Sequence, residues 1–264
     1  MAIPTEVRSA RIAAAYLLTR TFISLLGLGA VIWGGFALPV FWQQAAASGV
    51  ASAILRGHTF KMQWLSNATR RAEAAEQSAF CNPTALHNAV VLRLDALDEA
   101  IAATNQALVD SVYSPLYDAT RKALSCTPAD SFVWLALFWL DAGKYGFDSD
   151  NANYLRLSYA LGPNESWIAL WRSRLAFALF ERLPTDLADD AIDEFIKLVD
   201  TEKLYPETAA IFVSAGSTAQ SRIIAHLKTA RDIPRQRFAR TLQDKGMSVD
   251  VPDVYRPGSE RPWK

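Results

Sequence analysis

Residues 123–135 read ALSCTPADSFVWL, and residues 158–170, thirty-five positions later, read SYALGPNESWIAL. Both segments place a proline, an acidic residue, an aromatic residue and a leucine at the same relative positions. The matching pairs are Pro128 and Pro163, Asp130 and Glu165, Phe132 and Trp167, and Leu135 and Leu170. Proline ends a helix but is tolerated in the first turn of the next one, and a short acidic side chain caps a helix start. The pattern therefore predicts a repeated unit in which one helix ends, the chain turns and a second helix begins.

A period of 34–35 residues with a proline-marked turn, Trp, Leu and Ala resembles the tetratricopeptide repeat. Residues 153–163, NYLRLSYALGP, look like the second helix of such a repeat and its closing turn. The resemblance covers residues 115–183 well, and looser copies begin at Pro83 and Pro206. It implies an α-solenoid whose helical hairpins bury their apolar faces by stacking, with Trp167 buried between hairpins. We therefore predict an all-α fold with a tetratricopeptide-like array over residues 83–230.

The most apolar stretch of this array is residues 131–140, SFVWLALFWL, which lies between Asp130 and Asp141. Ten residues are too few to cross a bilayer as a helix. The segment is therefore predicted to be the central buried helix, and a helix that rests on or re-enters the membrane is the alternative.

A longer apolar run precedes the array. Residues 22–42 read FISLLGLGAVIWGGFALPVFW and carry no charge. At about 1.5 Å per residue this run is long enough to cross a hydrocarbon core of about 30 Å. The small residues at 45–48 would suit a cleaved signal sequence instead, but apolar signal regions usually span only about 7–15 residues. We therefore predict an uncleaved transmembrane anchor at residues 22–42.

The charges beside the run predict its orientation. Arg8, Arg11 and Arg20 precede it, and no charge follows Trp42 until Arg56. Since basic flanks stay in the cytoplasm, residues 1–21 are predicted to be cytoplasmic and the bulk periplasmic, with the anchor in a bacterial inner membrane. Within the run, Ala30 and Gly34 form a small-xxx-small pair, through which two copies could dimerise.

Two further regions outside the repeats complete the predicted organisation. Residues 43–82 are predicted to form a juxtamembrane helix or linker, and residues 231–264 a basic helix followed by an irregular tail.

The two cysteines, Cys81 and Cys126, precede similar Asn-Pro and Thr-Pro corners. They form either a disulfide, which a periplasmic location permits, or two buried free thiols. The formal net charge of zero argues against a nucleic-acid partner.

A search of the sequence for chemistry finds no metal-ligand set, phosphate-binding loop or nucleophile–base pair, and we expect no cofactor, no metal and no enzymatic activity. The densest acidic group is one row at helical spacing, i, i+3, i+4, i+7 and i+8. Its members are Asp186, Asp189, Asp190, Asp193 and Glu194. An apolar stripe over residues 187–199 lies opposite, so the row is interpreted as the solvated face of an amphipathic helix. The alternative is a contact with a basic partner, including the chain's own C-terminal segment.

Trp167 and Trp171 are spaced i, i+4 and lie close to Arg172. Such a face could stack on sugar rings, although core packing is the more common role of aromatic residues at this spacing in a solenoid. The candidate partner-binding residues are accordingly Trp167, Trp171 and Arg172 together with the four aspartates Asp186, Asp189, Asp190 and Asp193.

The order of the pieces also resembles a wider group: an anchor, a CNP corner, a CTPADSF helix, the segment LGPNESWIALWR and a PWK end. It is similar to small anchored tetratricopeptide-like proteins of proteobacteria encoded beside envelope polysaccharide genes. The anchored helical array predicts a periplasmic adaptor that binds a protein or peptide in the cell envelope, and the resemblance implies that this partner belongs to envelope polysaccharide assembly. Two alternatives are a glycan-acting enzyme subunit, using Trp167, Arg172 and the row from Asp189 to Asp193, and a passive structural subunit of a multi-helix membrane complex.

Overall fold

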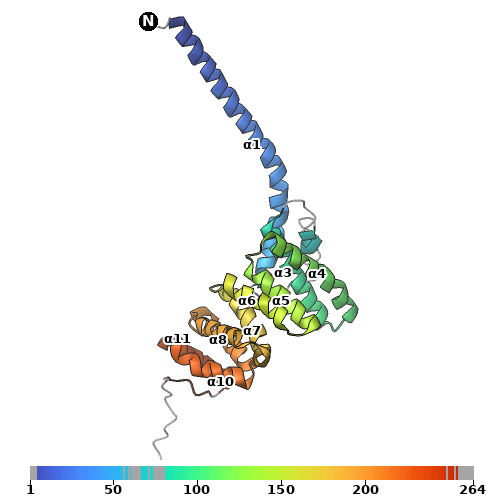
Figure 1. The fold of residues 1–264 in the computed structure, drawn as a ribbon, viewed down its shortest axis with the longest axis vertical. Helices are drawn as coiled ribbons and strands as arrows, with labels where there is room; N and C mark the ends of the chain where they lie inside the picture. Colours follow the sequence, from blue (N-terminus) through green and yellow to red (C-terminus); the bar gives the residue numbers. More distant parts are fainter. Residues whose placement is uncertain are drawn as a thin grey trace, which may run out of the picture. The chain divides into compact units, whose positions relative to one another are not determined.

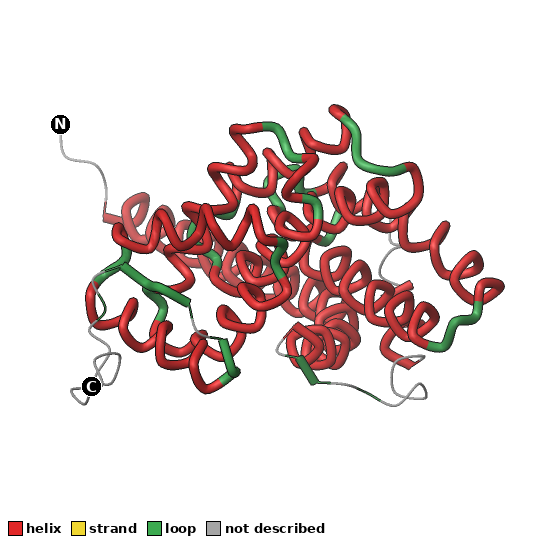
Figure 2. The backbone as a smooth tube through the Cα atoms, turned by 90° about the horizontal axis from the view of Figure 1, so that it is seen from below, coloured by secondary structure: helices red, strands yellow, loops and turns green. Residues whose placement is uncertain are grey.

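The computed structural model describes residues 5–55, 57–58, 60, 67–70, 72–73, 81–247, 249–252 and 254, without the side chains of residues 5–15, 39–44 and 46. Helices are the regular elements formed by these residues, loops and turns connect them, and none of the described residues lies in a strand (Figure 2). The predicted all-α class is therefore confirmed. The chain divides into two compact units, Met1–Leu92 and Arg93–Lys264.

Unit 1 is dominated by helix α1, which runs unbroken from Thr5 to Leu55 over 51 residues (Figure 1). At about 1.5 Å per residue the helix is about 77 Å long, more than twice the thickness of a hydrocarbon core. Its most apolar part, Tyr16–Leu38, is not buried by any other part of the protein, and Trp33 and Phe36 are 76% and 77% exposed. This segment is long and apolar enough to cross a membrane. It begins and ends a few residues before the predicted span of 22–42 and shares residues 22–38 with it.

Residues 43–55, the first part of the predicted linker, continue helix α1 without a break. A small core forms here from alanines of α1 and of the later part of unit 1. The cluster comprises Ala47, Ala68, Ala72, Ala89 and Leu92, with Val50, Ile54 and Phe60 packed against it. Asn88 Nδ2 donates a hydrogen bond of 2.8 Å to Ser48 Oγ, which joins α1 to the first half of helix α3, Pro83–Ala102. The end of the long helix is therefore packed within unit 1 and is not a free connection.

Unit 2 is an array of short helices connected by tight turns. The α-helices after α3 are α4 Gln106–Cys126, α5 Ser131–Tyr145, α6 Ser149–Leu161, α7 Ser166–Ala178, α8 Thr185–Val199, α9 Tyr205–Ser214, α10 Ser217–His226 and α11 Asp232–Asp244. Single 3₁₀ turns lie at Phe180–Arg182, Glu202–Leu204 and Leu227–Thr229. Each helix from α5 to α9 contacts the helix two places later in the chain. This arrangement is that of stacked helical hairpins and confirms a helical array.

The thirty-five-residue spacing has a direct structural counterpart. Helix α5 begins at Ser131 and α7 at Ser166, at equivalent points of the two repeats. Asp130 caps α5, because its Oδ1 accepts hydrogen bonds of 3.1 Å from the amides of Phe132 and Val133. The repeat-equivalent aromatic rings of Phe132 and Trp167 touch, with centroids 5.2 Å apart. Trp167 is only half-buried in this contact, however, so the prediction that it is buried between hairpins was too strong.

The predicted basic C-terminal helix is α11, and it belongs to the array. Its Phe238 is fully buried and meets the rings of Phe195 and Phe212 edge-on, each at a centroid distance of 5.9 Å. Helix α11 therefore packs on α8 and α9 and closes the end of the solenoid. Beyond it, Val251 is also buried, while residues 255–264 of the predicted irregular tail lie outside the described residues.

Of the two alternatives that the sequence left open for the cysteines, a disulfide or two free thiols, the structure excludes the free thiols. Cys81 and Cys126 are both disulfide-bonded, so neither is a free thiol. An oxidising compartment is where such a bond persists.

Candidate functional site

The acidic row lies on α8, and its apolar counterpart is buried as predicted. Two of the aspartates bind arginines of neighbouring helices. Asp186 accepts hydrogen bonds from Arg156 of α6, from Nε at 2.6 Å and from Nη2 at 3.2 Å, and this contact lowers the pKa of its carboxyl group. Asp189 forms an ion pair with Arg222 of α10. Both carboxylates therefore bind arginines within the array. The partner of Asp189, Arg222, belongs to the C-terminal part of the chain.

Asp190 and Asp193 remain exposed on the same face. Partial burial raises the pKa of Asp190, and the neighbouring carboxylates of Asp186, Asp193 and Asp189 raise it further. The ionised form of Asp190 is thus disfavoured in the folded protein. Asp190 therefore lies in an excess of negative charge that the ion pairs of Asp186 and Asp189 do not remove.

Two of the polar residues singled out in the sequence are buried, which corrects their interpretation. Glu194 is 4% exposed and does not share the solvated face, and Arg172 is completely buried and cannot reach a partner. Arg172 Nε donates to Glu194 Oε1 at 3.1 Å and to Oε2 at 3.0 Å. Its Nη1 donates to Ser158 Oγ at 3.0 Å and its Nη2 to the carbonyl of Gly162 at 2.9 Å. The pair therefore links α6, α7 and α8 inside the solenoid.

The predicted sugar-stacking face is not assembled. Trp171 is 37% exposed, Trp167 packs against Phe132, and Arg172 lies in the interior above the ring of Tyr159 at 4.5 Å. Among the residues that the structure describes, no group of three His, Cys, Asp or Glu side chains is placed to hold a metal ion. The residues named from the sequence thus serve mainly to hold the array together.

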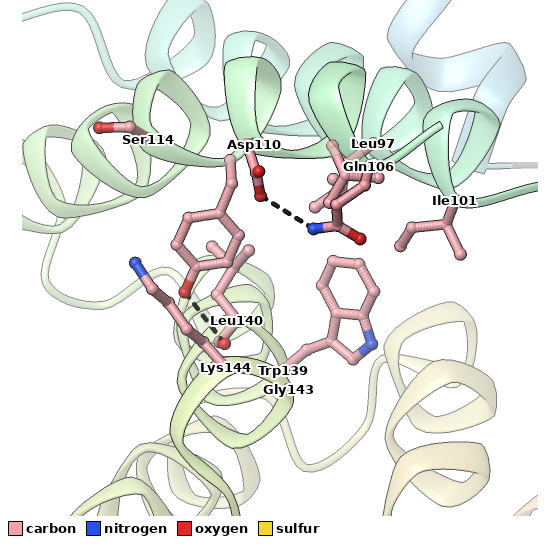
Figure 3. A pocket seen from close by; sticks show the side chains of 11 residues that line it. Leu97, Ile101, Gln106, Asp110, Ser114, Trp139, Leu140, Gly143 and Lys144 are labelled. Carbon is pink, nitrogen blue, oxygen red and sulfur yellow. Dashed lines mark hydrogen bonds between the residues drawn. The ribbon is translucent and has the colours of Figure 1, made fainter. Parts of the chain in front are cut away.

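A cleft of about 520 Å³ on unit 2 is the stronger candidate site. It opens between the end of α3, the first half of α4 and the second half of α5 (Figure 3). Its apolar lining comprises Leu97, Ile101, Val109, Trp139 and Leu140, and its polar or small lining comprises Gln106, Asp110, Tyr113, Ser114, Gly143 and Lys144. Ile101 is 49% exposed at its edge. The cleft is mainly apolar and carries a few polar groups, as is typical of binding pockets.

Local structure explains why these helices leave a cleft. The turn after α3 contains Thr104, whose φ of +52° reverses the chain sharply, and Asn105 then caps α4 by accepting a hydrogen bond of 3.1 Å from the amide of Leu108. On α5 the apolar residues extend all round the helix, so one side packs into the array while Trp139 is left half-exposed towards the cleft. This excess of apolar residues on α5 is the sequence signal that could have located the cleft.

Hydrogen bonds orient several polar groups that line the cleft. Gln106 Nε2 donates a hydrogen bond of 2.9 Å to Asp110 Oδ1, and the Tyr113 hydroxyl donates one of 3.1 Å to the carbonyl of Leu140 (Figure 3). Burial, followed by the nearby carboxylate of Asp141, raises the pKa of Tyr113 to about 12, so the hydroxyl stays protonated as a donor. The ammonium group of Lys144 lies 4.5 Å from the centroid of the Tyr113 ring. The cleft is therefore a formed surface with an apolar centre and a polar margin.

Comparison of the chain with family models, with curated proteins and with solved structures finds no match. The class of the protein follows from its fold and site alone. Its described residues form an all-α protein in which an N-terminal helix capable of spanning a membrane precedes a helical array that carries a sizeable apolar cleft.

Proposed function

We propose that this protein is a membrane-anchored adaptor that binds a protein or peptide partner in the bacterial cell envelope. The observation that carries the proposal is the apolar cleft of unit 2, in which Ile101 and Trp139 remain accessible to a partner. Grooves between helices commonly receive an amphipathic helix or an extended peptide, whose apolar side chains serve as anchors. The cleft is large enough to take one or two such side chains.

The exposed apolar helix supports the membrane anchor. Among the described residues of Tyr16–Leu38 none is buried, which is costly in water but favourable in a bilayer. The basic residues before the span favour an N-terminus in the cytoplasm and a periplasmic bulk at the inner membrane. The disulfide-bonded state of the cysteines supports an oxidising compartment.

Resemblance to anchored tetratricopeptide-like proteins adds envelope polysaccharide assembly as the setting of the adaptor. Within this proposal the partner is a protein, since the groups that a glycan-acting subunit would need do not meet at an open surface: Arg172 is buried against Glu194. A homodimer through Ala30 and Gly34 is compatible with the anchor, because an added methyl group at Gly34 would meet nothing within 4 Å.

Site-specific photocrosslinking tests the adaptor function. A photoreactive amino acid placed at Ile101 in the full-length chain, in its native membrane, is expected to capture a protein, because this side chain is at the edge of the cleft. The matched control is Ile233, which is 62% exposed on α11 and does not line the cleft. Crosslinked products are measured by gel mobility and mass spectrometry. Absence of a protein adduct at position 101, or identical adducts at both positions, would contradict the proposed function.

Membrane topology is a separate expectation. A reporter enzyme that is active only in the periplasm, fused after Lys264, should be active, because the basic residues Arg8, Arg11 and Arg20 hold the N-terminus in the cytoplasm. Replacing these three arginines with glutamate should reduce the reporter activity per molecule. Activity solely from a reporter that works in the cytoplasm would refute the predicted orientation. Mature protein that begins near Ser48 would refute the anchor while keeping export.

A further inference from the structure

Next to the cleft, α4 carries a ladder of aromatic and cationic side chains along one face. Tyr113, Tyr117 and Arg121 follow one another at four-residue intervals, so they lie one above the other on the helix. The rings of Tyr113 and Tyr117 stack with centroids 6.2 Å apart and planes 14° from parallel. Arg121 lies 5.9 Å from the centroid of the Tyr117 ring, and Lys144 of α5 lies 4.5 Å from that of Tyr113. Two cations thus rest on a continuous tyrosine surface that begins inside the cleft.

These two cations are not neutralised by carboxylates. Six other arginines of unit 2 form ion pairs with aspartate or glutamate: Arg156, Arg172, Arg222, Arg231, Arg235 and Arg237. Among the described residues, neither Arg121 nor Lys144 has a carboxylate oxygen within ion-pair distance. The acid that both cations influence is Asp141, yet it forms no ion pair with either, and its Oδ1 is enclosed without a hydrogen-bond partner. Both cations are exposed.

The carboxylate that lines the cleft, Asp110, accepts a hydrogen bond from Gln106 and, among the described residues, forms no ion pair with either cation. A cation on an exposed aromatic ring is held only weakly and can still pair with an anion. The mouth of the cleft therefore combines an apolar centre with two positive charges that an acidic partner would complement.

Geometry limits the form of that partner. Arg121 lies eight residues beyond Tyr113 on the same helix, about 12 Å along its axis. An extended peptide covers this distance in about four residues, and a helical peptide in about two turns. A short segment that places an apolar side chain in the cleft can therefore bring carboxylates to Lys144 and Arg121 at the same time.

We propose that the cleft receives an acidic amphipathic segment of a partner protein, whose apolar side chain enters between Ile101 and Trp139 while its carboxylates pair with Lys144 and Arg121. This inference rests on the proposed adaptor function and names the chemistry of the partner. The charged margin of the cleft selects an acidic partner and increases its rate of association. The apolar centre of the cleft provides most of the contact area.

Charge reversal in the full-length chain tests the inference. With the photoreactive residue at position 101, Lys144→Glu and Arg121→Glu should each reduce capture of the partner by about fivefold or more, since loss of an exposed ion pair is worth up to about 1 kcal/mol and reversal adds repulsion. Lys144→Arg should retain capture because the charge is kept. The matched controls Lys203→Glu and Arg240→Glu change the same charges on exposed residues outside the cleft and should not alter capture.

The captured segment itself provides the second measurement. Mass spectrometry of the adduct should place at least two aspartate or glutamate residues within about eight positions of the crosslinked residue, which is about two turns of a helical peptide and also covers the shorter reach of an extended chain. Capture should also weaken as salt increases. A neutral or basic segment, or capture that both reversals leave unchanged, would overturn this inference while the adaptor function stands. An adduct with lipid or glycan alone, or no adduct at position 101, would overturn both.

Discussion

Glu194→Ala is expected to lower the free energy of unfolding by about 3–5 kcal/mol, because it leaves a buried guanidinium group without its counter-ion. Arg172 is completely buried, and the two oxygens of Glu194 accept from its Nε at 3.1 and 3.0 Å. Urea unfolding of the full-length chain in detergent, followed by tryptophan fluorescence, measures the change.

The control for this experiment is the exposed acidic row of the same helix. Neutralising Asp189, Asp190 and Asp193 together to asparagine should change the stability far less, since exposed ion pairs are worth about 0–1 kcal/mol. The raised pKa of Asp190 also predicts a small change in stability, because removing a charge that the folded state disfavours does not destabilise the fold. A triple variant as unstable as Glu194→Ala would contradict the assignment of Glu194 to the interior and the aspartates to the surface.

The pair is expected to direct the packing of the helices more than it increases their stability. Burial raises the pKa of Glu194, and the hydrogen bonds from Arg172 lower it only in part. An acid with a raised folded pKa binds its proton more tightly in the folded state, so its contribution to stability declines as the pH rises through the folded pKa. Replacing both residues, as Arg172→Met with Glu194→Leu, should therefore recover part of the loss. Recovery stays incomplete because the carbonyl of Gly162 then lacks the donor it has at 2.9 Å.

The array was predictable because its signals are local. Three signals recur after thirty-five residues: a proline-marked turn, an acidic residue at the position of the Asp130 cap and an aromatic residue two positions later. Each of them affects only residues close to it in sequence, as the bond from the Phe132 amide to Asp130 shows. The burial of Glu194 was also partly visible in the sequence. At 100° per residue it lies about 80° around the helix from Asp186, at the edge of the row and towards the apolar stripe.

The partners of the buried groups were not predictable in this way. Arg172 lies next to Trp171 in sequence, and whether it points outwards or inwards depends on how α8 stacks against α7, twenty-two residues away. The cleft likewise requires the relative positions of α3, α4 and α5. Local pattern identifies the helices, whereas a site formed between helices depends on their stacking.

Phe238→Ala is expected to have a similarly large effect, lowering the free energy of unfolding by about 3–5 kcal/mol. The sequence alone placed the basic helix outside the repeats, yet the Phe238 ring fills the space between Phe195 of α8 and Phe212 of α9, 5.9 Å from each. Truncation removes two edge-to-face contacts and leaves a cavity at the end of the solenoid, where terminal helices cover the apolar face of the preceding repeat. Thermal and urea unfolding of the full-length chain in detergent measure this effect.

Ile233→Ala is the matched control, because it truncates a large apolar side chain on the same helix that is 62% exposed. Its effect should stay within about 0.5 kcal/mol, as is usual for surface substitutions. If Phe238→Ala were equally mild, α11 would be an appendage to an array that ends at α10, as the sequence predicted. If it is severe, the interior of the solenoid extends through α11, and the C-terminal helix is needed to keep α8, which carries both Glu194 and the acidic row, in its stacked position.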